Sequence, residues 1–226
     1  MNSLNKTSKL AGVLYLIITF IAPFSMLYVP SKLIVAGDAL TTASNIQSAQ
    51  GLFRAAIASD ALVFLLEIAL TVLVYQLVKP VDKTLALISA YARLGMTVIQ
   101  GVNVINYLFV LLLVNGAGYL SALANGQSQS LVSLFLHAHD SASLIWGLFF
   151  GVHLLMLGYL VYKSGYMPKW LGVVLLITSL LYLAQGFGII LFPQFEASIK
   201  SMMSLAFIEI AFPLWLLVKG VKDQPA

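Results

Sequence analysis

Long apolar stretches constrain this chain more than any other feature of its sequence. A helix needs ~20 residues to cross a hydrocarbon core of about 30 Å. Six stretches between the polar loops are long enough. In chain order they are Leu10–Val29, Phe53–Val78, Thr84–Val114, Ser141–Tyr162, Lys169–Phe192 and Met202–Val218. The sequence therefore predicts an all-α integral membrane protein, a six-helix bundle in which residues 1–226 form a single transmembrane domain.

The composition agrees with a lipid environment. Hydrophobic residues make up 61% of the chain and charged residues only 9%, against roughly 25% charged in soluble domains. A soluble domain of this size could not hide so much apolar surface. Cysteine is absent, which excludes disulfides, thiolate nucleophiles and cysteine-ligated metal sites. The basic residues form no run of the kind that binds nucleic acid, so no nucleic-acid partner is expected.

The distribution of basic residues predicts the orientation, because Lys and Arg are enriched in cytoplasmic loops. Eight lysines fall at the ends or loops of one side: Lys6, Lys9, Lys79, Lys83, Lys163, Lys169, Lys219 and Lys222. The opposite side holds three basic residues, Lys32, Arg54 and Lys200. This bias predicts that both termini are cytoplasmic.

Four ionisable residues occur at similar depths in four of the predicted spans. Counting ~1.5 Å per helical residue from the nearest cytoplasmic lysine places Glu67 at ~18 Å. The same count places Arg93, His153 and Glu209 at ~15 Å. Ionisable groups within spans usually face the interior and mark functional sites. We therefore expect these four side chains to converge near the midplane, where they are candidates for binding a ligand or a proton.

Two neighbouring spans offer partners for the acids. Asp60 and Glu67 are seven residues apart and share a helix face. After the tight loop "KPVDK", the next span presents Arg93 at the depth of Glu67 and Gln100 near the depth of Asp60. We expect Glu67 to form an ion pair with Arg93. We expect Asp60, nearer the outer side, to form an amide–carboxyl hydrogen bond with Gln100. The alternative is a purely structural pair that fixes helix register. Further polar candidates are Asn103, Asn106 and Gln185.

Prolines and glycines add detail to these spans. Pro213 is expected to free the carbonyl of residue 209, and Pro23 that of Thr19, although such kinks also occur for packing alone. His153 is a candidate proton relay to Glu209 or Glu67, with an ordinary interhelical hydrogen bond as the alternative. On the same span, three glycines form a stripe that predicts close helix packing: Gly147, Gly151 and Gly158.

The outer loops contain a short histidine cluster. Residues 31–52 are expected to include a short surface helix, and residues 115–140 an interfacial or re-entrant segment. The latter ends in His137, His139 and Asp140, two imidazoles and a carboxylate that could hold zinc. His-x-His puts both rings on one face only in an extended segment, and Asp140 also suits an N-cap of the fourth span. A metal site is therefore the lesser interpretation, and no cofactor is expected.

Several segments resemble a known family. They are "GDALTTASNI", "LFR", "FFGVHLLMLGYLVYKSGYMPKWLGVVLLITSLLYL" and "PLWLLVKG". Through these segments the chain resembles the bacterial multi-pass membrane proteins catalogued as domain of unknown function 4386. The resemblance covers nearly the whole chain. The block from Gly158 to Gly172 is the most specific part. The resemblance implies a bacterial cytoplasmic (inner) membrane location and a single helical domain, but it supplies no activity and no functional residues.

Three hypotheses for function follow. The leading one is a transporter-like protein that binds or conducts a proton, cation or small polar ligand through Glu67, Arg93, His153 and Glu209, in the bilayer as a monomer or homo-oligomer. The second is an intramembrane, metal-dependent, lipid-modifying enzyme that uses the outer histidines. The third is a non-catalytic structural or partner-binding membrane protein. No Gly-x-Ser-x-Gly, His-Glu-x-x-His or phosphate-binding glycine loop is present, so enzyme activity is the less favoured interpretation.

Overall fold

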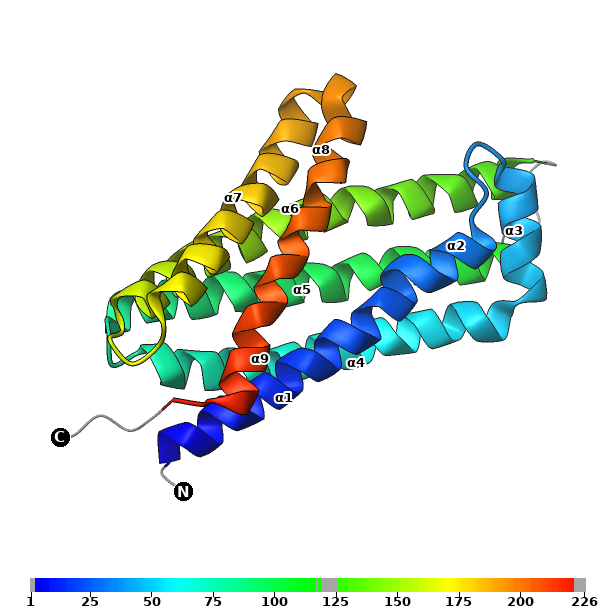
Figure 1. Cartoon of the computed structure of the whole chain (residues 1–226). Helices are drawn as coiled ribbons and strands as arrows, with labels where there is room; N and C mark the ends of the chain where they lie inside the picture. The colour runs from blue at the N-terminus through cyan, green and yellow to red at the C-terminus, as the bar shows by residue number, and fades with distance from the viewer. Residues whose placement is uncertain (1–2, 117, 119–125, 222–226) are drawn as a thin grey trace. The chain divides into compact units, whose positions relative to one another are not determined.

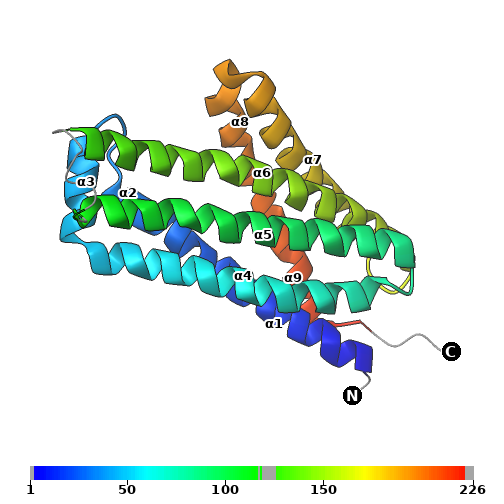
Figure 2. The same cartoon turned by 180° about the vertical axis from the view of Figure 1, so that it is seen from behind.

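The computed structural model describes residues 3–116, 118 and 126–221, and its elements there are all helical (Figures 1 and 2). The helices are α1 (Ser3–Pro23), α2 (Val29–Leu33), α3 (Ala39–Ser48), α4 (Gln50–Val78), α5 (Lys83–Val114), α6 (Gln127–Lys163), α7 (Lys169–Leu191), α8 (Glu196–Met202) and α9 (Ala211–Val218). Segments of other winding join some of them: the π-helical turn η1 (Phe24–Tyr28), the 3₁₀ turn η3 (Pro193–Phe195) and the 3₁₀ run η4 (Met203–Ile210).

Six helical segments within the described residues are long and apolar enough to cross a membrane. They are Leu4–Leu33, Gln50–Val78, Lys83–Val114, Gln127–Lys163, Lys169–Leu191 and Pro193–Val218. The prediction of an all-helical chain with six apolar spans is thus confirmed, and the short helix predicted in residues 31–52 is α3. The cytoplasmic location of both termini stays a prediction. Lys222 lies outside the described residues, as do residues 117 and 119–125 of the second outer loop.

The fourth span differs most from its predicted bounds. It was expected to begin at Ser141 behind a separate segment, whereas α6 begins at Gln127. The predicted N-cap at Asp140 is therefore wrong, because Asp140 lies in the interior of this helix. The apolar run "LVSLFL" continues the helical winding and adds more than three turns on the N-terminal side. This extension determines where the two outer histidines point.

The chain divides into two compact units. The first unit contains Met1–Thr19, Leu65–Val98 and Leu144–Ala226, and the second contains Phe20–Phe64 and Ile99–Ser143. Helices α1, α4, α5 and α6 contribute residues to both. The prediction of a single transmembrane domain stays a prediction, and each unit has its own packing.

Glycines allow close packing of α6 against α7 in the first unit. The three-glycine stripe predicted on α6 faces α7: an added Cβ would meet Tyr182 at Gly147, Leu183 at Gly151, and the Gly172 carbonyl oxygen at Gly158. At Gly172 itself, a Cβ would lie 2.6 Å from the backbone of both Gly158 and Tyr162. α7 continues through η3 into α8, and these two helices lie side by side in both views of the chain.

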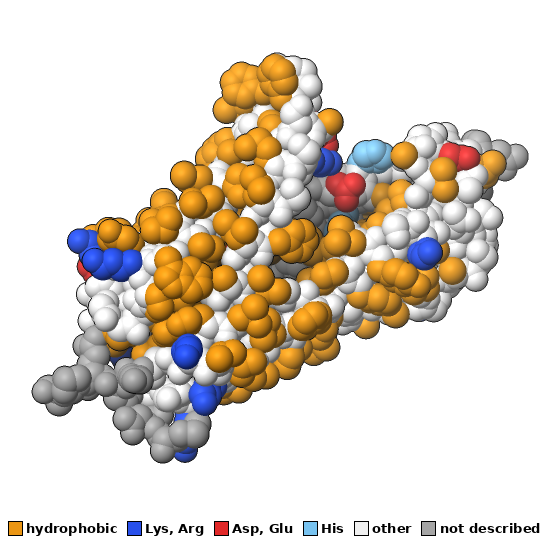
Figure 3. Space-filling model, viewed as in Figure 1, with side chains coloured by type: hydrophobic (Ala, Val, Ile, Leu, Met, Phe, Trp, Pro, Cys, Tyr) orange, Lys and Arg blue, Asp and Glu red, His pale blue; other side chains and the backbone are white. Residues whose placement is uncertain are grey.

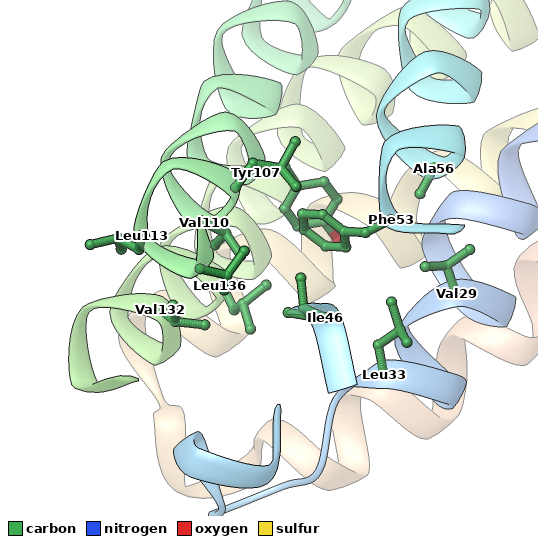
Figure 4. Packing of buried hydrophobic residues seen from close by; sticks show 12 residues of the cluster. Val29, Leu33, Ile46, Phe53, Ala56, Tyr107, Val110, Leu113, Val132 and Leu136 are labelled. Atoms are coloured by element: carbon green, nitrogen blue, oxygen red, sulfur yellow. The ribbon is translucent and has the colours of Figure 1, made fainter. Parts of the chain in front are cut away.

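A continuous apolar cluster forms the core of the second unit. Figure 4 shows side chains from α2, α3, α4, α5 and α6 pointing toward one another, including Leu33, Ile46 and Val132. The ring centroids of Phe53 and Tyr107 lie 5.0 Å apart within this cluster. The cluster therefore joins the short α3 to the long helices.

Asp38 caps the N-terminus of α3. Its carboxylate accepts hydrogen bonds from the backbone N–H of Thr41, at 2.9 Å, and from the Thr41 hydroxyl, at 2.6 Å. These hydrogen bonds hold the pKa of Asp38 below its ordinary value. The stabilising cap is therefore present above the ordinary carboxyl pKa and is lost as the pH falls through the lowered one.

The outer surface suits a lipid environment. In the view of Figure 3, hydrophobic side chains cover the exposed flanks of the long helices, whereas the blue Lys and Arg groups are few. Exposed large hydrophobic residues include Phe20, Leu180 and Phe207. In water such a surface would drive aggregation, whereas in a bilayer it faces acyl chains.

The crossing of α6 and α7 generates a stability prediction. We expect Gly172→Ala to lower the free energy of unfolding by about 1–3 kcal/mol, because the new Cβ would overlap backbone atoms that cannot rotate away. Gly101→Ala is the matched control, since nothing lies within 4 Å of a Cβ there. Thermal unfolding in detergent, followed by circular dichroism, measures both variants. Equal melting temperatures for the two would contradict the close crossing.

Candidate functional site

A buried ion pair lies at the centre of the first unit. Arg93 on α5 is 1% exposed and Glu67 on α4 is 7% exposed. The Nε and Nη2 atoms of Arg93 both lie 2.7 Å from Oε2 of Glu67. The ion pair expected from the sequence is therefore confirmed. Both donors are aimed at one carboxylate oxygen, which holds the guanidinium in a fixed orientation.

His153 on α6 contacts the other side of the guanidinium. Nη1 of Arg93 lies 2.9 Å from Nε2 of His153. An arginine N–H can only donate, so Nε2 is the acceptor and carries no proton. Nδ1 then carries the ring proton and donates to the Ser89 carbonyl oxygen at 3.0 Å, while the Ser89 hydroxyl donates to the His153 carbonyl oxygen at 3.2 Å. The contacts thus select one neutral tautomer of His153.

Aromatic rings complete the surroundings of Arg93. The guanidinium carbon lies 4.9 Å from the ring centroid of Tyr15 on α1 and 5.9 Å from that of Phe150 on α6. The Phe150 ring stacks in turn on His153, with a centroid distance of 5.9 Å. Cations are attracted to aromatic faces, most strongly where water is excluded. Every side of the Arg93 head group described here has a partner.

Glu209 is the fourth residue of the predicted layer, and it lacks such a partner. It lies near the end of η4, and its Oε2 atom is buried without a hydrogen-bond partner among the described residues. Its carboxylate interacts electrostatically with Arg93 and Glu67. The side chain of Tyr15 is also buried, and it interacts electrostatically with both Glu209 and Arg93. The four predicted residues thus lie in one unit, but only three of them are joined by hydrogen bonds.

Changes of helix winding accompany both prolines singled out in the sequence. Pro23 is the last residue of α1, and the π-helical η1 follows it directly. Pro213 lies in the first turn of α9, and the eight residues before that helix are wound as 3₁₀. Proline cannot donate a backbone hydrogen bond and its ring clashes with the preceding turn, which explains why regular α winding stops nearby. Glu209 and Ser25 both lie in the altered segments.

The secondary polar candidates are arranged differently from the prediction. Asp60 accepts a hydrogen bond from the hydroxyl of Ser25 on η1. The predicted bond to Gln100 is wrong, because no hydrogen bond joins the two within the described residues and Gln100 is only half-buried. The π-helical turn supplies a nearer donor that the sequence count did not reveal.

Two of the remaining amides lie in the second unit and one in the first. Asn103 donates to the carbonyl oxygen of His139 at 3.0 Å, and Asn106 donates to the side-chain oxygen of Asn103 at 3.0 Å. Asn103 therefore joins α5 to α6, and Asn106 supports Asn103 on the same helix. Gln185 lies half-buried on α7.

The outer histidine cluster is not gathered at one point. In helical α6, residues two apart are ~200° apart around the axis, so His137 is exposed while His139 is buried. The His139 ring stacks on Tyr107 with a centroid distance of 3.8 Å, and Asp140 is exposed. Within the described residues, no group of three His, Cys, Asp or Glu side chains is placed to hold a metal ion. The interpretation of His137, His139 and Asp140 as a joint metal site is therefore wrong.

Sequence reasoning missed three side chains of this region. Ser89 precedes Arg93 by four residues, so the helical period alone places it on the face that meets His153. Tyr15 and Ser25 had no comparable signal, because the rotation of α1 and the π-helical winding of η1 are not visible in the sequence.

The buried pair generates a second stability prediction. Arg93→Met removes the counter-charge of Glu67, and an unpaired buried charge costs about 3–5 kcal/mol. We expect the free energy of unfolding in detergent to fall by about that amount. Arg54→Met, at an exposed arginine of α4, should change it little. Denaturant titration measures both variants, and equal stabilities would contradict the central role of Arg93.

The chain is similar to an archaeal protein that is described as uncharacterized. An uncharacterized protein of Archaeoglobus fulgidus is 29% identical over 166 residues, which cover 71% of this chain and 81% of that protein. Similar sequences are therefore not confined to bacteria. No solved structure matches the chain.

A family match covers most of the chain and agrees with the resemblance noted in its sequence. The family described as "Domain of unknown function (DUF4386)" matches residues 10–220, which include all four residues of the predicted layer. The protein belongs to this family of unknown function.

Proposed function

We propose that this protein binds a proton or a small cation at Glu209 and conducts it across the membrane. The proposal rests on one observation, the buried Oε2 atom of Glu209 without a partner beside an ion pair that is already complete. Glu67 and Arg93 neutralise each other, and the contacts of His153 select its neutral form. An ionised Glu209 therefore leaves one negative charge without a counter-charge.

The residue Glu209 is half-buried, and its Oε2 atom is the buried one. An isolated charge in the hydrocarbon region is costly, so this carboxylate needs a proton or a cation. Exchange of that proton or cation is the elementary step of a carrier or channel. The Tyr15 hydroxyl, which interacts electrostatically with Glu209, supplies a second buried oxygen in this proposal. A small polar ligand with a donor group would meet the same two oxygens. In this proposal the other three residues of the layer surround Glu209 with polar groups that are already paired: Glu67, Arg93 and His153.

The alternative hypotheses have less support. A metal-dependent lipid enzyme loses its candidate ligands, because His137 is exposed and His139 is buried on another face of α6. A purely structural role accounts well for the Glu67–Arg93 pair, but it gives no reason for a buried carboxylate oxygen without a partner. The unpaired Glu209 thus favours a binding function over both.

Glu209→Gln tests the proposal directly. The variant has nearly the same shape but cannot lose or gain a proton. In proteoliposomes with an entrapped pH dye, we expect its proton flux to fall to the level of protein-free vesicles. Glu196→Gln is the matched control, since this acid of α8, whose side chain is 47% exposed, pairs only with Lys200 in the described chain and should leave flux unchanged.

The same vesicles distinguish the proposed ligands. Proton flux that is independent of Na⁺ and K⁺ supports a proton site, and flux that requires one of these ions supports cation exchange. Wild-type flux in Glu209→Gln, with its unfolding temperature unchanged, would refute the proposed function.

We further propose that both termini are cytoplasmic, in a cell membrane of a prokaryote. The lysine bias supports this orientation, and the absence of cysteine makes it easy to test. We expect Ser48→Cys to react with a membrane-impermeant thiol reagent on intact cells, whereas Lys83→Cys reacts only after permeabilisation. The reverse pattern would show that the orientation is inverted.

A further inference from the structure

The second unit contains another buried acid that the proposed function does not use. Asp60 is 3% exposed, and the described chain shows no ion pair between it and a basic side chain. Its described hydrogen-bond donor is the hydroxyl of Ser25, itself 1% exposed. A hydroxyl does not neutralise a carboxylate, so an ionised Asp60 is a buried negative charge held by a neutral partner.

Ser25 can serve both protonation states of Asp60. Its hydroxyl oxygen lies within hydrogen-bond distance of the Asp60 carboxylate and 3.1 Å from the Ala22 carbonyl oxygen. It has a single hydrogen, so it donates to one of them at a time. With Asp60 ionised, Ser25 donates to the carboxylate. With Asp60 protonated, the acid donates to Ser25, which then donates to Ala22.

The π-helical winding of η1 creates this arrangement. Ser25 is the second residue of η1, directly after the helix that Pro23 ends. Such local widenings of a helix occur frequently at functional sites, because they redirect a side chain or a carbonyl group out of the regular pattern. Here the π-helical turn contains Ser25, whose hydroxyl meets the acid.

His139 is an independent sign that the cluster is incomplete. The residue is 6% exposed, yet neither ring nitrogen has a hydrogen-bond partner in the described chain. The ring is held parallel to Tyr107, with an interplanar angle of 11°. It interacts electrostatically with Asp60 without contacting it directly. A neutral imidazole with a free acceptor is the natural exchange partner for a proton on the acid.

We propose that Asp60, Ser25 and His139 form a second proton-binding site. Asp60 holds the proton in the occupied state, Ser25 switches its donated hydrogen bond between Asp60 and Ala22, and His139 exchanges the proton with Asp60. The site is independent of Glu209, which belongs to the other unit.

The other groups around the site do not supply a counter-charge. α5 contributes the neutral Tyr107 phenol, which interacts electrostatically with Asp60 and Asp140. On α6, Asp140 is exposed and lies 4.0 Å from Nδ1 of His139, and it carries a negative charge rather than a positive one. α2 and α3 contribute apolar residues to this region. The remaining charged or titratable residues on these elements are exposed: Lys32, Asp38, Arg54 and His137.

Infrared spectroscopy of the protein in lipid nanodiscs tests the site. A protonated carboxylic acid has a C=O stretching band that an ionised one lacks. We expect wild type to show such a band that titrates with pH, and Asp60→Asn to lose the Asp60 part of it, while any part from Glu209 is retained. Asp38→Asn, at an exposed acid of the same unit, should retain the band. Circular dichroism and gel filtration establish that each variant is folded.

Two further variants separate this site from the proposed function. Glu209→Gln should retain the Asp60 band even if its flux is lost. His139→Gln should move the titration midpoint, because the group that exchanges the proton with Asp60 is removed. Identical spectra of folded wild type and Asp60→Asn at every pH would overturn the proposal. An unmoved midpoint in His139→Gln would remove His139 from the site, and loss of the band in Glu209→Gln would assign it to the wrong acid.

Discussion

A guanidinium in an apolar interior must have a partner for every polar edge, and this requirement organises the first unit. Arg93 on α5 meets that condition with groups from three other helices: Glu67 on α4, His153 on α6 and Tyr15 on α1. Each contact depends on the rotation of a different helix. The cost of leaving any edge unpaired therefore fixes how four helices are turned relative to one another within this unit.

The same contacts leave no hydrogen bond from Arg93 to Glu209 in the described chain. Arg93 has directed two donors to Glu67 and one to His153, and its faces are covered by aromatic rings. A buried pair of this kind is weak evidence for added stability, since the desolvation of both charges offsets much of their attraction. The pair matters here because Glu67 and Arg93 already neutralise each other. An additional acid next to a complete pair has to find its neutralising partner elsewhere.

The sequence predicted what depends on length, hydropathy and residue counts. Six apolar spans follow from stretches of ~20 residues or more, and the Glu67–Arg93 pair follows from a tight loop between two helices whose depths could be counted. The family match also agrees with the segments that suggested it. These features are local, or involve neighbours in the chain.

What the sequence did not reveal depends on winding and rotation. The bond between Ser25 and Asp60 arises from a π-helical turn, and the count that paired Asp60 with Gln100 assumed regular α winding. Asp140 and the outer histidines were misplaced because an apolar run expected to end in a loop continues as α6. The tautomer of His153 depends on which helix faces it, and one sequence does not contain that information.

The run η4 is overwound in comparison with the helices around it. A 3₁₀ segment rises about 2.0 Å and turns about 120° per residue, against about 1.5 Å and 100° in an α-helix. Rewinding the eight residues of η4 as α-helix would shorten the segment by about 4 Å and twist its two ends against each other by about 160°. Such a screw motion leaves the chain helical throughout, while it turns a side chain at one end almost to the opposite flank. The pitch of this short segment therefore determines the direction in which Glu209 points.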